Sequence, residues 1–481
     1  MMENLKKVTR AQWYLIALFI GFAFLMQNCQ DDDALIYEEN QTPAELSSKG
    51  PPVGNKVDVC RYNERKGTYS IVSLNTKFVP DRLQPSDVII DEDGDGYAAY
   101  NECGVLNGDG IDLDDTNPDI NPGAVEICGD GIDNNCNGET DEGCTYVPDD
   151  NFEQALIDLG YDTILDNYVL TSNINTRTSL NVNYYEGYSS GKIADLTGIE
   201  DFTALQNLAC DYNQITSLDL SDNTALTLLS CNDNQLTSLN VSSNAALTYL
   251  YCNYNQLTSL DVSNNTSLVW FSCGVNQLES LDVSNNTALK YFGCAVNLLE
   301  SLDVSKNTAL ESLYFNENKL TSINLSQNTS LRILHAHNNQ LTSLDVSNNP
   351  NLSLFYCHYN KLISLDVSNN PNLADFYCYN NLLTSLGLSS NTNLAWLDCS
   401  ENQLTSLDVG NNTVLEGLWI EDNQLESLDV SQNTVLEYLE CFNNEALGCI
   451  QVNMSQLATA PTDPNWIKDG SAVYSTDCSS N

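Results

Sequence analysis

The segment DEDGDGYAAYNE, residues 91–102, has the spacing of oxygen ligands that a metal-binding loop needs. Aspartates alternate along it, a glycine follows at the sharp turn, and a glutamate closes it, so the segment fits the pattern D-x-D-x-D-G-x5-E. Hard oxygen donors at this spacing select Ca²⁺. We therefore predict a calcium loop whose ligands are Asp91, Asp93, Asp95, the Tyr97 carbonyl and Glu102.

A second run of acidic and amide side chains extends from residue 112 to residue 142. Its oxygen-bearing residues again stand largely at alternate positions, as in DNNCNGETDE at 133–142. Such a run can supply ligands for further calcium ions, so we expect residues 89–144 to form a small loop-rich calcium-binding domain. The predicted ligands in this run are Asp112, Asp114, Asp133, Asn135, Asn137 and Glu142.

Residues 91–144 resemble a metal-binding motif of secreted bacterial proteins, most closely over 117–141. The family is sometimes labelled copper-binding, but the oxygen-rich donor set here favours Ca²⁺. Export to an oxidising compartment would permit disulfides in this segment, although the resemblance leaves the partner of one cysteine open. The pairs considered are Cys128 with Cys136 and, as a second bridge, Cys103 with Cys144.

Most of the chain is built from a repeat of 21 residues. Twelve units, beginning at Leu205, follow the rule L-x-x-L-x-C-x-x-N-x-L-x-x-L-x-V-x-x-N-x-x. The pattern is similar to the leucine-rich repeat, which implies a solenoid of short parallel strands. The apolar side chains of one unit contribute about 12 kcal/mol, whereas ordering its residues costs on the order of 30 kcal/mol, so a unit folds only in a stack.

Two columns of the repeat are expected to be structural. The asparagines that begin at Asn213 sit where the chain leaves the strand, and a buried amide there can satisfy backbone groups of the turn. Cysteines at the sixth position stand on parallel strands with parallel side chains, so their Cβ vectors do not converge on a disulfide. We expect reduced, packed thiols at Cys210, Cys231, Cys252, Cys273, Cys294, Cys357, Cys378, Cys399 and Cys441.

The variable third, fifth and seventh positions of the repeat should face outward, because side chains alternate along a strand. Aromatic residues crowd these positions, together with all 3 histidines of the chain. One interpretation is that aromatic side chains simply suit strands; the other is a concave binding surface for a protein or a glycan. The predicted ligand-binding residues are Tyr249, Tyr251, Trp270, Tyr291, Tyr314, His335, His337, Tyr356, His358, Tyr377, Tyr379, Trp396, Trp419 and Tyr438.

The histidines allow a further hypothesis. His337 and His358 occupy one position in adjacent units, about 4.8 Å apart, and His335 lies on the same face. Three imidazoles could share a transition metal, but no nearby acid or cysteine completes a set. A pH-sensitive patch of ligand contacts is therefore the favoured interpretation. We find no nucleophile with an orienting acid, and we do not expect an enzyme.

Charge and the N-terminus indicate the location. A net charge of −47 and a pI of about 4.1 oppose binding to nucleic acid or to anionic membrane surfaces. Basic residues precede an apolar run at 14–26 that is too short for a comfortable span, which is typical of an export signal. The run ends just before Cys29 and resembles a bacterial lipoprotein signal, which implies a lipid anchor on Cys29, the protein's sole membrane attachment, in the outer membrane with the chain exposed at the surface.

The remaining segments complete the expected organisation. The divisions are 1–29 signal peptide, 30–56 tether, 57–88 small β-rich spacer, 89–144 calcium-loop domain, 145–204 N-terminal cap and irregular repeats, 205–446 repeats, and 447–481 C-terminal cap. We expect a monomer. The favoured function is adhesion or capture at a cell surface; the alternative is a structural envelope or spacer protein without a specific ligand.

The caps carry their own expectations. A helix in the N-terminal cap should begin at Asp150 or Asn151 and place one apolar face against the first strands. That face would consist of Phe152, Leu156 and Leu159, with Gly160 ending the helix. At the other end, Cys449 and Cys478 could join as a disulfide and staple the C-terminal cap.

Overall fold

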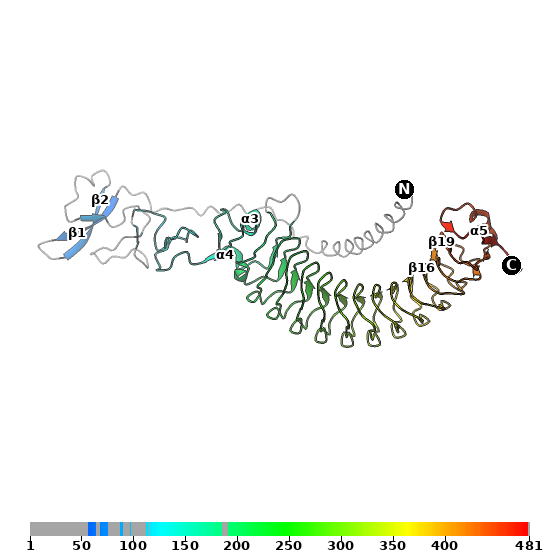
Figure 1. The fold of residues 1–481 in the computed structure, drawn as a ribbon. Coiled ribbons are helices and arrows are strands. Elements are labelled where there is room, and N and C mark those ends of the chain that lie inside the picture. Colours follow the sequence, from blue (N-terminus) through cyan, green and yellow to red (C-terminus); the bar gives the residue numbers. More distant parts are fainter. Residues whose placement is uncertain are drawn as a thin grey trace. The chain divides into compact units, whose positions relative to one another are not determined.

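The computed structural model describes residues 56–63, 68–75, 87–89, 97, 112–114, 116–184 and 191–479 (Figure 1). These residues belong to two compact units, which divide between Pro122 and Gly123. The predicted signal peptide with Cys29, the tether apart from Lys56, Cys103, and the calcium loop at 91–102 apart from Tyr97 lie outside the described residues. None of the helices within the described part of the chain has the length and hydropathy needed to cross a bilayer.

The first unit contains a three-stranded antiparallel sheet in the order β2-β1-β3. Its strands are β1 (Lys56–Asn63), β2 (Thr68–Asn75) and β3 (Asp87–Ile89). Val59, in the centre of β1, pairs with Val72 on one side and with Ile89 on the other. Valine, isoleucine and tyrosine favour extended backbone, which accounts for strands in the segment predicted to be a β-rich spacer.

The second unit is a solenoid whose strands form one parallel 14-stranded sheet along the concave side of an arc (Figure 1). From β7 to β19 the strands of this sheet recur every 21 residues, which confirms the predicted repeat. The strands are β6 (Ser179–Asn181), β7 (Asn207–Ala209), β8 (Leu228–Ser230), β9 (Tyr249–Tyr251), β10 (Trp270–Ser272), β11 (Tyr291–Gly293), β12 (Ser312–Tyr314), β13 (Ile333–His335), β14 (Leu354–Tyr356), β15 (Asp375–Tyr377), β16 (Trp396–Asp398), β17 (Gly417–Trp419), β19 (Tyr438–Glu440) and β21 (Trp466–Ile467).

Every unit buries the same grid of side chains against its neighbours. In one unit the residues that are 0% exposed include Leu247, Leu250, Cys252, Leu257 and Val262. The predicted column of cysteines is buried as free thiols, and this expectation is confirmed. Burial disfavours the thiolate and raises the pKa of Cys252 to about 12, so the column acts as a set of small apolar side chains.

A ladder of buried asparagine amides joins consecutive turns, as predicted for the column that begins at Asn213. Asn339 accepts a hydrogen bond from the Leu320 backbone N–H at 3.0 Å. Its side-chain amide donates to the carbonyl oxygens of Phe315 at 3.1 Å and Ala336 at 3.3 Å. These backbone groups are inaccessible to water, so the amide supplies partners that the turn itself lacks.

A second asparagine ladder lies at the nineteenth position of the repeat. Asn307, which is 0% exposed, donates to the carbonyl oxygens of Val283 and Asn286, both at 2.9 Å. Helix α5 (Met454–Thr459) ends this ladder, because Gln456 donates from Nε2 to the Asn433 carbonyl oxygen at 2.9 Å in place of another asparagine. The hydrogen-bond ladder therefore extends one step into the C-terminal cap, where Gln456 takes the place of the repeat asparagine.

A small parallel sheet joins the last complete repeat to the C-terminal cap. Its strands are β18 (Leu428–Asp429) in the last complete repeat, and β20 (Cys449–Gln451) and β22 (Val473–Ser475) in the cap. A disulfide joins Cys449 in β20 to Cys478, the pair considered from the sequence, with a Cα–Cα distance of 5.8 Å. Backbone pairing of β18 with β20 thus ties the cap to the last complete repeat, and the disulfide closes a loop within the cap.

The N-terminal cap packs two short helices and a strand pair against the first turn. Antiparallel β4 (Cys144–Tyr146) and β5 (Tyr168–Leu170) flank α3 (Asp150–Asp158), and α4 (Thr171–Ile174) and the 3-10 helix η2 (Ile199–Asp201) follow. Phe152 and Leu156 are 0% exposed, but Leu159 is 41% exposed, so its predicted place on the buried face is wrong. Leu159 already lies at the end of α3, where Gly160 turns the chain with φ of 73°.

The predicted N-cap of α3 is also wrong. Asp149, rather than either of the next two residues, accepts hydrogen bonds from the backbone N–H groups of Asn151 and Phe152 at 2.9 and 3.1 Å. Its second oxygen accepts from the Ala194 and Asp195 backbone N–H groups at 2.7 and 2.9 Å. Asp149 is favoured because one carboxylate can satisfy both the helix start and a distant turn.

Candidate functional site

The sheet presents three columns of outward side chains, because the middle residue of each strand points into the core. The first column is the first residue of each strand, the second is its third residue, and the third lies two residues further along the chain. All residues predicted to bind a ligand lie in these columns, and we call the set the aromatic face. It consists of Tyr249, Tyr251, Trp270, Tyr291, Tyr314, His335, His337, Tyr356, His358, Tyr377, Tyr379, Trp396, Trp419 and Tyr438.

Most of these rings form one connected group, the central cluster. Trp270 stacks on Tyr291 with ring centroids 3.8 Å apart, and Tyr356 stacks on Tyr377 at 4.6 Å. The rings between these two pairs follow one another at 4.6 to 5.0 Å. The central cluster comprises Tyr251, Trp270, Tyr291, Tyr314, His335, His337, Tyr356, His358, Tyr377 and Tyr379.

Stacking hides part of the aromatic face. Tyr379 is 8% exposed and His358 is 4% exposed, so both support neighbouring rings and offer little surface to a ligand. Burial among its neighbours also raises the pKa of the Tyr291 hydroxyl. Tyr249 and Tyr438 remain 40% and 37% exposed, near opposite ends of the face.

The histidines are neutral over the physiological pH range. Burial disfavours the imidazolium and lowers the pKa of His335 to about 3, of His337 to about 4 and of His358 to about 2. The expected pH-sensitive patch is therefore wrong, because no ring titrates near neutrality. The three histidines also do not form a metal site. Among the residues that the structure describes, their ring nitrogens do not all lie within 4.8 Å of one another, as three ligands of one ion would.

His358→Phe is expected to reduce the loss of stability on acidification. In the folded protein the pKa of His358 is about 2, below the ordinary value of about 6.5 that applies to the unfolded chain. The unfolded state therefore binds a proton first, which removes about 1.5 kcal/mol of stability between pH 6.5 and pH 5 and continues toward the folded pKa. Denaturant titrations at both pH values compare the two proteins; an identical drop in both would contradict this account.

A second group, the C-terminal cluster, consists of Trp396, Trp419 and Tyr438. The two tryptophan rings stack with centroids 5.8 Å apart, and Trp419 stacks on Tyr438 at 6.3 Å. Gly417 makes room for them, because a Cβ there would lie 2.5 Å from Trp396 Cε3 and 2.6 Å from Trp419 Cζ3. Asp375 on β15 and Glu440 on β19 lie on either side of β16 and β17 at this end of the sheet. Burial, with the Glu416 charge, raises the pKa of Asp375.

Gly417→Ala is expected to displace the tryptophan rings and to destabilise the protein by about 1–3 kcal/mol, the usual cost of overpacking. The displaced indoles should also change the tryptophan fluorescence spectrum. Gly387→Ala is the matched control, since a Cβ at Gly387 meets nothing within 4 Å. Wild-type stability and an unchanged spectrum in Gly417→Ala would refute the close packing.

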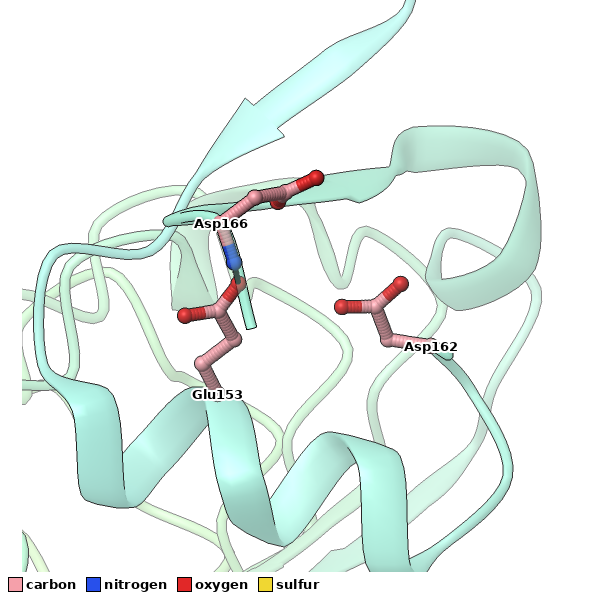
Figure 2. Close-up of side chains that lie close together, drawn as sticks. All are labelled: Glu153, Asp162 and Asp166. Carbon is pink, nitrogen blue, oxygen red and sulfur yellow. Dashed lines mark hydrogen bonds between the residues drawn. The ribbon is translucent and has the colours of Figure 1, made fainter. Parts of the chain in front are cut away.

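A carboxylate group in the N-terminal cap was missed from the sequence. Glu153 in α3 and Asp162 and Asp166 in the loop before β5 each bring one oxygen within 4.8 Å of the others (Figure 2). Among the residues that the structure describes, no other group of three acidic, histidine or cysteine side chains meets this distance. The available signal was the pair of aspartates four residues apart, directly after the end of the helix.

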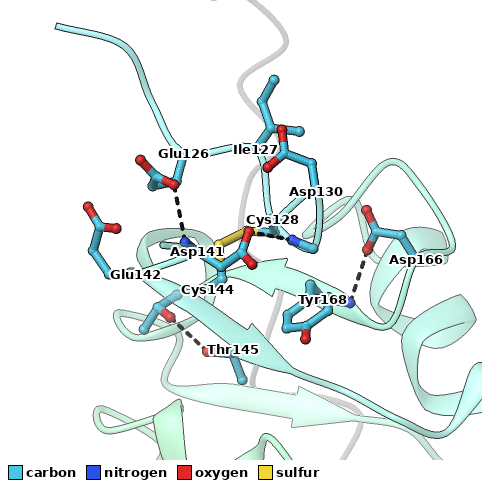
Figure 3. The surroundings of a disulfide bond; sticks show 12 residues. Glu126, Ile127, Cys128, Asp130, Asp141, Glu142, Cys144, Thr145, Asp166 and Tyr168 are labelled. Atoms are coloured by element: carbon cyan, nitrogen blue, oxygen red, sulfur yellow. Dashed lines mark hydrogen bonds between the residues drawn. A yellow bond between two sulfur atoms is a disulfide. The ribbon is translucent and has the colours of Figure 1, made fainter. Parts of the chain in front are cut away.

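Part of the predicted metal motif folds around two glutamates (Figure 3). Glu126, which is 6% exposed, accepts hydrogen bonds from the backbone N–H groups of Asn135 at 2.8 Å and Asp141 at 3.3 Å. One oxygen of Glu142 accepts from the side-chain amides of Asn135 and Asn137, so three predicted ligands converge. The second Glu142 oxygen is buried without a hydrogen-bond donor, and this oxygen is the one of the group that a hard cation would fit.

Other predicted ligands of the motif organise local turns. Asp133 accepts hydrogen bonds from the backbone N–H groups of Asn137 and Gly138 at 3.0 and 2.8 Å. In the first unit, Asp112 accepts from the Asp114 backbone N–H at 2.8 Å. The role of Glu126 was missed, because a buried carboxylate that holds backbone N–H groups has no signature in the alternation of acidic residues.

The disulfide in this segment joins Cys128 to Cys144, with a Cα–Cα distance of 5.7 Å (Figure 3). The predicted pairing of Cys128 with Cys136 is therefore wrong. The chain returns toward Cys128 only after Cys136, because Asp141 accepts a hydrogen bond from the Gly129 backbone N–H at 2.9 Å and Cys144 follows at the start of β4. Cys136 instead lies in a turn between the predicted ligands Asn135 and Asn137, with φ of 58°.

Known proteins resemble this chain in its metal motif and in its repeats. Residues 112–142 match a family model described as "Putative metal-binding motif". A curated relative, Internalin J of Listeria monocytogenes, is 37% identical over 84 residues, which are 18% of this chain and 8% of that protein. The matched segment is thus a small fraction of that relative's length.

Solved structures extend the similarity to about two thirds of the chain. The functional domain of InlJ from Listeria monocytogenes, described as including a cysteine ladder, matches with a TM-score of 0.53 and 32% identity, covering 68% of this chain and 80% of that domain. Internalin InlF from the same species matches with a TM-score of 0.55 and 23% identity over 68% of this chain and 95% of that one, which supports the fold. Neither is described as an enzyme.

Proposed function

Because the chain belongs to the leucine-rich repeat proteins related to the Listeria internalins, we propose that it is a cell-surface binding protein whose aromatic face holds a protein or glycan ligand. Solenoids of this kind commonly use an extended concave surface for binding. The observation that carries the proposal is the run of contacting rings on this face, from Tyr251 to Tyr379 in the central cluster, with the C-terminal cluster further along the same sheet.

The stacked rings suit binding for an entropic reason. The rings of the two clusters are already held by their neighbours, as Trp270 and Tyr291 are at a centroid distance of 3.8 Å. A ligand that covers them therefore immobilises few additional torsions, and large rigid aromatic groups supply contact area at low entropic cost. The surface is thus preorganised for a ligand with apolar faces.

Charge narrows the class of ligand. The chain has a net charge of −47, and Asp375 and Glu440 lie beside the C-terminal cluster. A polyanion would be repelled from this end, whereas a neutral glycan or a protein with basic side chains would meet favourable carboxylates. Protein binding is the commoner use of the repeat, so a protein is the first ligand to test.

Replacing Trp396 and Trp419 together by alanine is expected to weaken ligand binding at least about 30-fold, the size of one strong anchor residue. The screen uses a glycan array and a panel of purified surface proteins, probed with residues 57–481. Tyr146→Ala is the matched control, because Tyr146 is 52% exposed on β4 and outside the aromatic face. Equal binding by the tryptophan variant and the control would reject the aromatic face as the binding surface.

The alternative is a structural envelope or spacer protein. It is favoured by the extent to which the rings cover one another, as at Tyr379, which is 8% exposed. Chemical modification of tyrosines distinguishes the two functions: a ligand found in the screen should protect Tyr249 and Tyr438, the two rings left exposed on the face. A folded protein that captures nothing, with no protection in cell-surface extracts, would favour the spacer.

The proposal also includes where the protein is anchored and which ion the metal motif binds. The basic N-terminus and the apolar run before Cys29 support a lipid anchor in a bacterial outer membrane, with a monomeric chain exposed at the surface. The oxygen-rich composition of the metal motif, with one Glu142 oxygen buried without a donor, supports Ca²⁺ as its ion. Titration with Ca²⁺ and with Cu²⁺ tests this choice.

A further inference from the structure

The N-terminal cap contains a carboxylate cluster that the metal motif does not include. Glu153 projects from α3, and Asp162 and Asp166 belong to the loop that connects α3 to β5 (Figure 2). One oxygen from each side chain lies within 4.8 Å of the other two. Glu153 is 0% exposed, whereas Asp166 is the most accessible of the three, so the cluster extends from the core toward solvent.

Backbone hydrogen bonds hold the carboxylates in place but leave oxygens unused. Glu153 Oε1 accepts from the backbone N–H groups of Asp166 and Asn167, both at 2.7 Å. Asp162 Oδ1 accepts from the Thr163 backbone N–H, also at 2.7 Å. The second oxygens, Glu153 Oε2 and Asp162 Oδ2, are buried without a hydrogen-bond donor. Buried unpartnered oxygens are rare, and carboxylates in this state need a positive partner or a proton.

The electrostatics agree with a missing positive charge. Burial raises the pKa of Glu153 and of Asp162, and the neighbouring Asp166 carboxylate adds to both shifts. Three carboxylates this close repel one another unless a cation lies between them. Three carboxylates around one position favour Ca²⁺, which takes oxygen ligands at about 2.3–2.6 Å in a flexible shell. Mg²⁺, at about 2.1 Å, demands a tighter shell.

We propose that Glu153, Asp162 and Asp166 bind a calcium ion in the N-terminal cap, separate from the ions of the metal motif. The ion joins α3 to the loop before β5, and β5 pairs with β4 next to the Cys128–Cys144 disulfide. Binding therefore stiffens the end of the solenoid where the repeat grid begins. Its occupancy does not depend on what the aromatic face binds.

The experiment counts calcium ions on the full chain by equilibrium dialysis with ⁴⁵Ca²⁺, so that other sites contribute equally to every variant. Glu153→Gln keeps an acceptor oxygen for the Asp166 and Asn167 N–H groups but removes the charge. Asp162→Asn is the second variant, at a half-buried position where misfolding is a smaller risk. Asp158→Asn is the matched control, an exposed carboxylate of the same helix.

We expect the wild type and Asp158→Asn to bind one more calcium ion per chain than Glu153→Gln and Asp162→Asn. Hydrogen exchange of residues 150–170 should also slow on addition of Ca²⁺ in the wild type and remain unchanged in Asp162→Asn. Equal calcium counts in the wild type and a folded Asp162→Asn would overturn the site. So would calcium-independent exchange of 150–170 in the wild type, which would indicate that a proton neutralises the cluster instead.

Discussion

Phe355→Ala is expected to lower the free energy of unfolding by about 4 kcal/mol. Phe355 is 0% exposed and stacks on Phe376 of the next turn, with ring centroids 5.4 Å apart. Truncation removes the transfer free energy of the ring and leaves a cavity between two strands whose backbones cannot close in, because the ladders on either side fix their spacing. Urea unfolding followed by circular dichroism gives the change in free energy.

Ile363→Ala is the control for this experiment. Ile363 lies in the same repeat and is 63% exposed, so its truncation should change the free energy by no more than about 0.5 kcal/mol. Because neighbouring repeats contact only one another, the cavity should destabilise the turns next to β14 most strongly. Equal destabilisation by the two substitutions would show that Phe355 is not part of a tightly packed core.

Asn339→Ala is expected to cost about 3 kcal/mol, although the side chain is polar. It removes the acceptor for the Leu320 backbone N–H and a donor to the Phe315 and Ala336 carbonyl oxygens, and no water can replace them in the core. A buried backbone group left without a partner costs about 1–3 kcal/mol. Alanine can neither accept the hydrogen bond from Leu320 nor donate to the carbonyl oxygens, so several backbone groups lose their partners. The measurement is again the free energy of unfolding in urea.

Gln340→Ala tests whether position rather than polarity causes this loss. Gln340 follows Asn339 directly and is exposed, so its truncation should have almost no effect. Asn339→Asp gives a second comparison, because the carboxylate keeps the acceptor for Leu320 but lacks the donors. A wild-type stability for Asn339→Ala would mean that the amide ladder is incidental to the stacking of the turns.

Much of the solenoid could be predicted because its environment repeats. Leu250, Cys252 and Asn255 each meet the same neighbours as their counterparts one turn away, so a pattern in the sequence corresponds to a contact in space. The columns of the aromatic face followed from the same argument, since alternation along a three-residue strand leaves little choice of direction. Outside the repeat, a pattern in the sequence no longer corresponds to a fixed contact in space.

The errors fall where contacts depend on the path of irregular chain. The pairing of Cys128 with Cys144 depends on how Asp141 folds back onto Gly129, and the capping of α3 by Asp149 depends on a turn some 45 residues away. The spacing of cysteines along the chain does not reveal this pairing, and the spacing of acidic residues does not reveal which aspartate caps α3.

The sequence by itself determined the period, the buried leucine and cysteine columns, the amide ladder at the turns and the side of the sheet on which the aromatic residues lie, because these follow from local alternation and stacking. Only the tertiary structure decided which rings remain exposed, since Tyr379 and His358 stack on each other and are buried, although they occupy outward positions of the repeat. It also decided that Glu153 meets Asp162 and Asp166, because a helix and the loop that follows it must fold together before three carboxylates can share one cation.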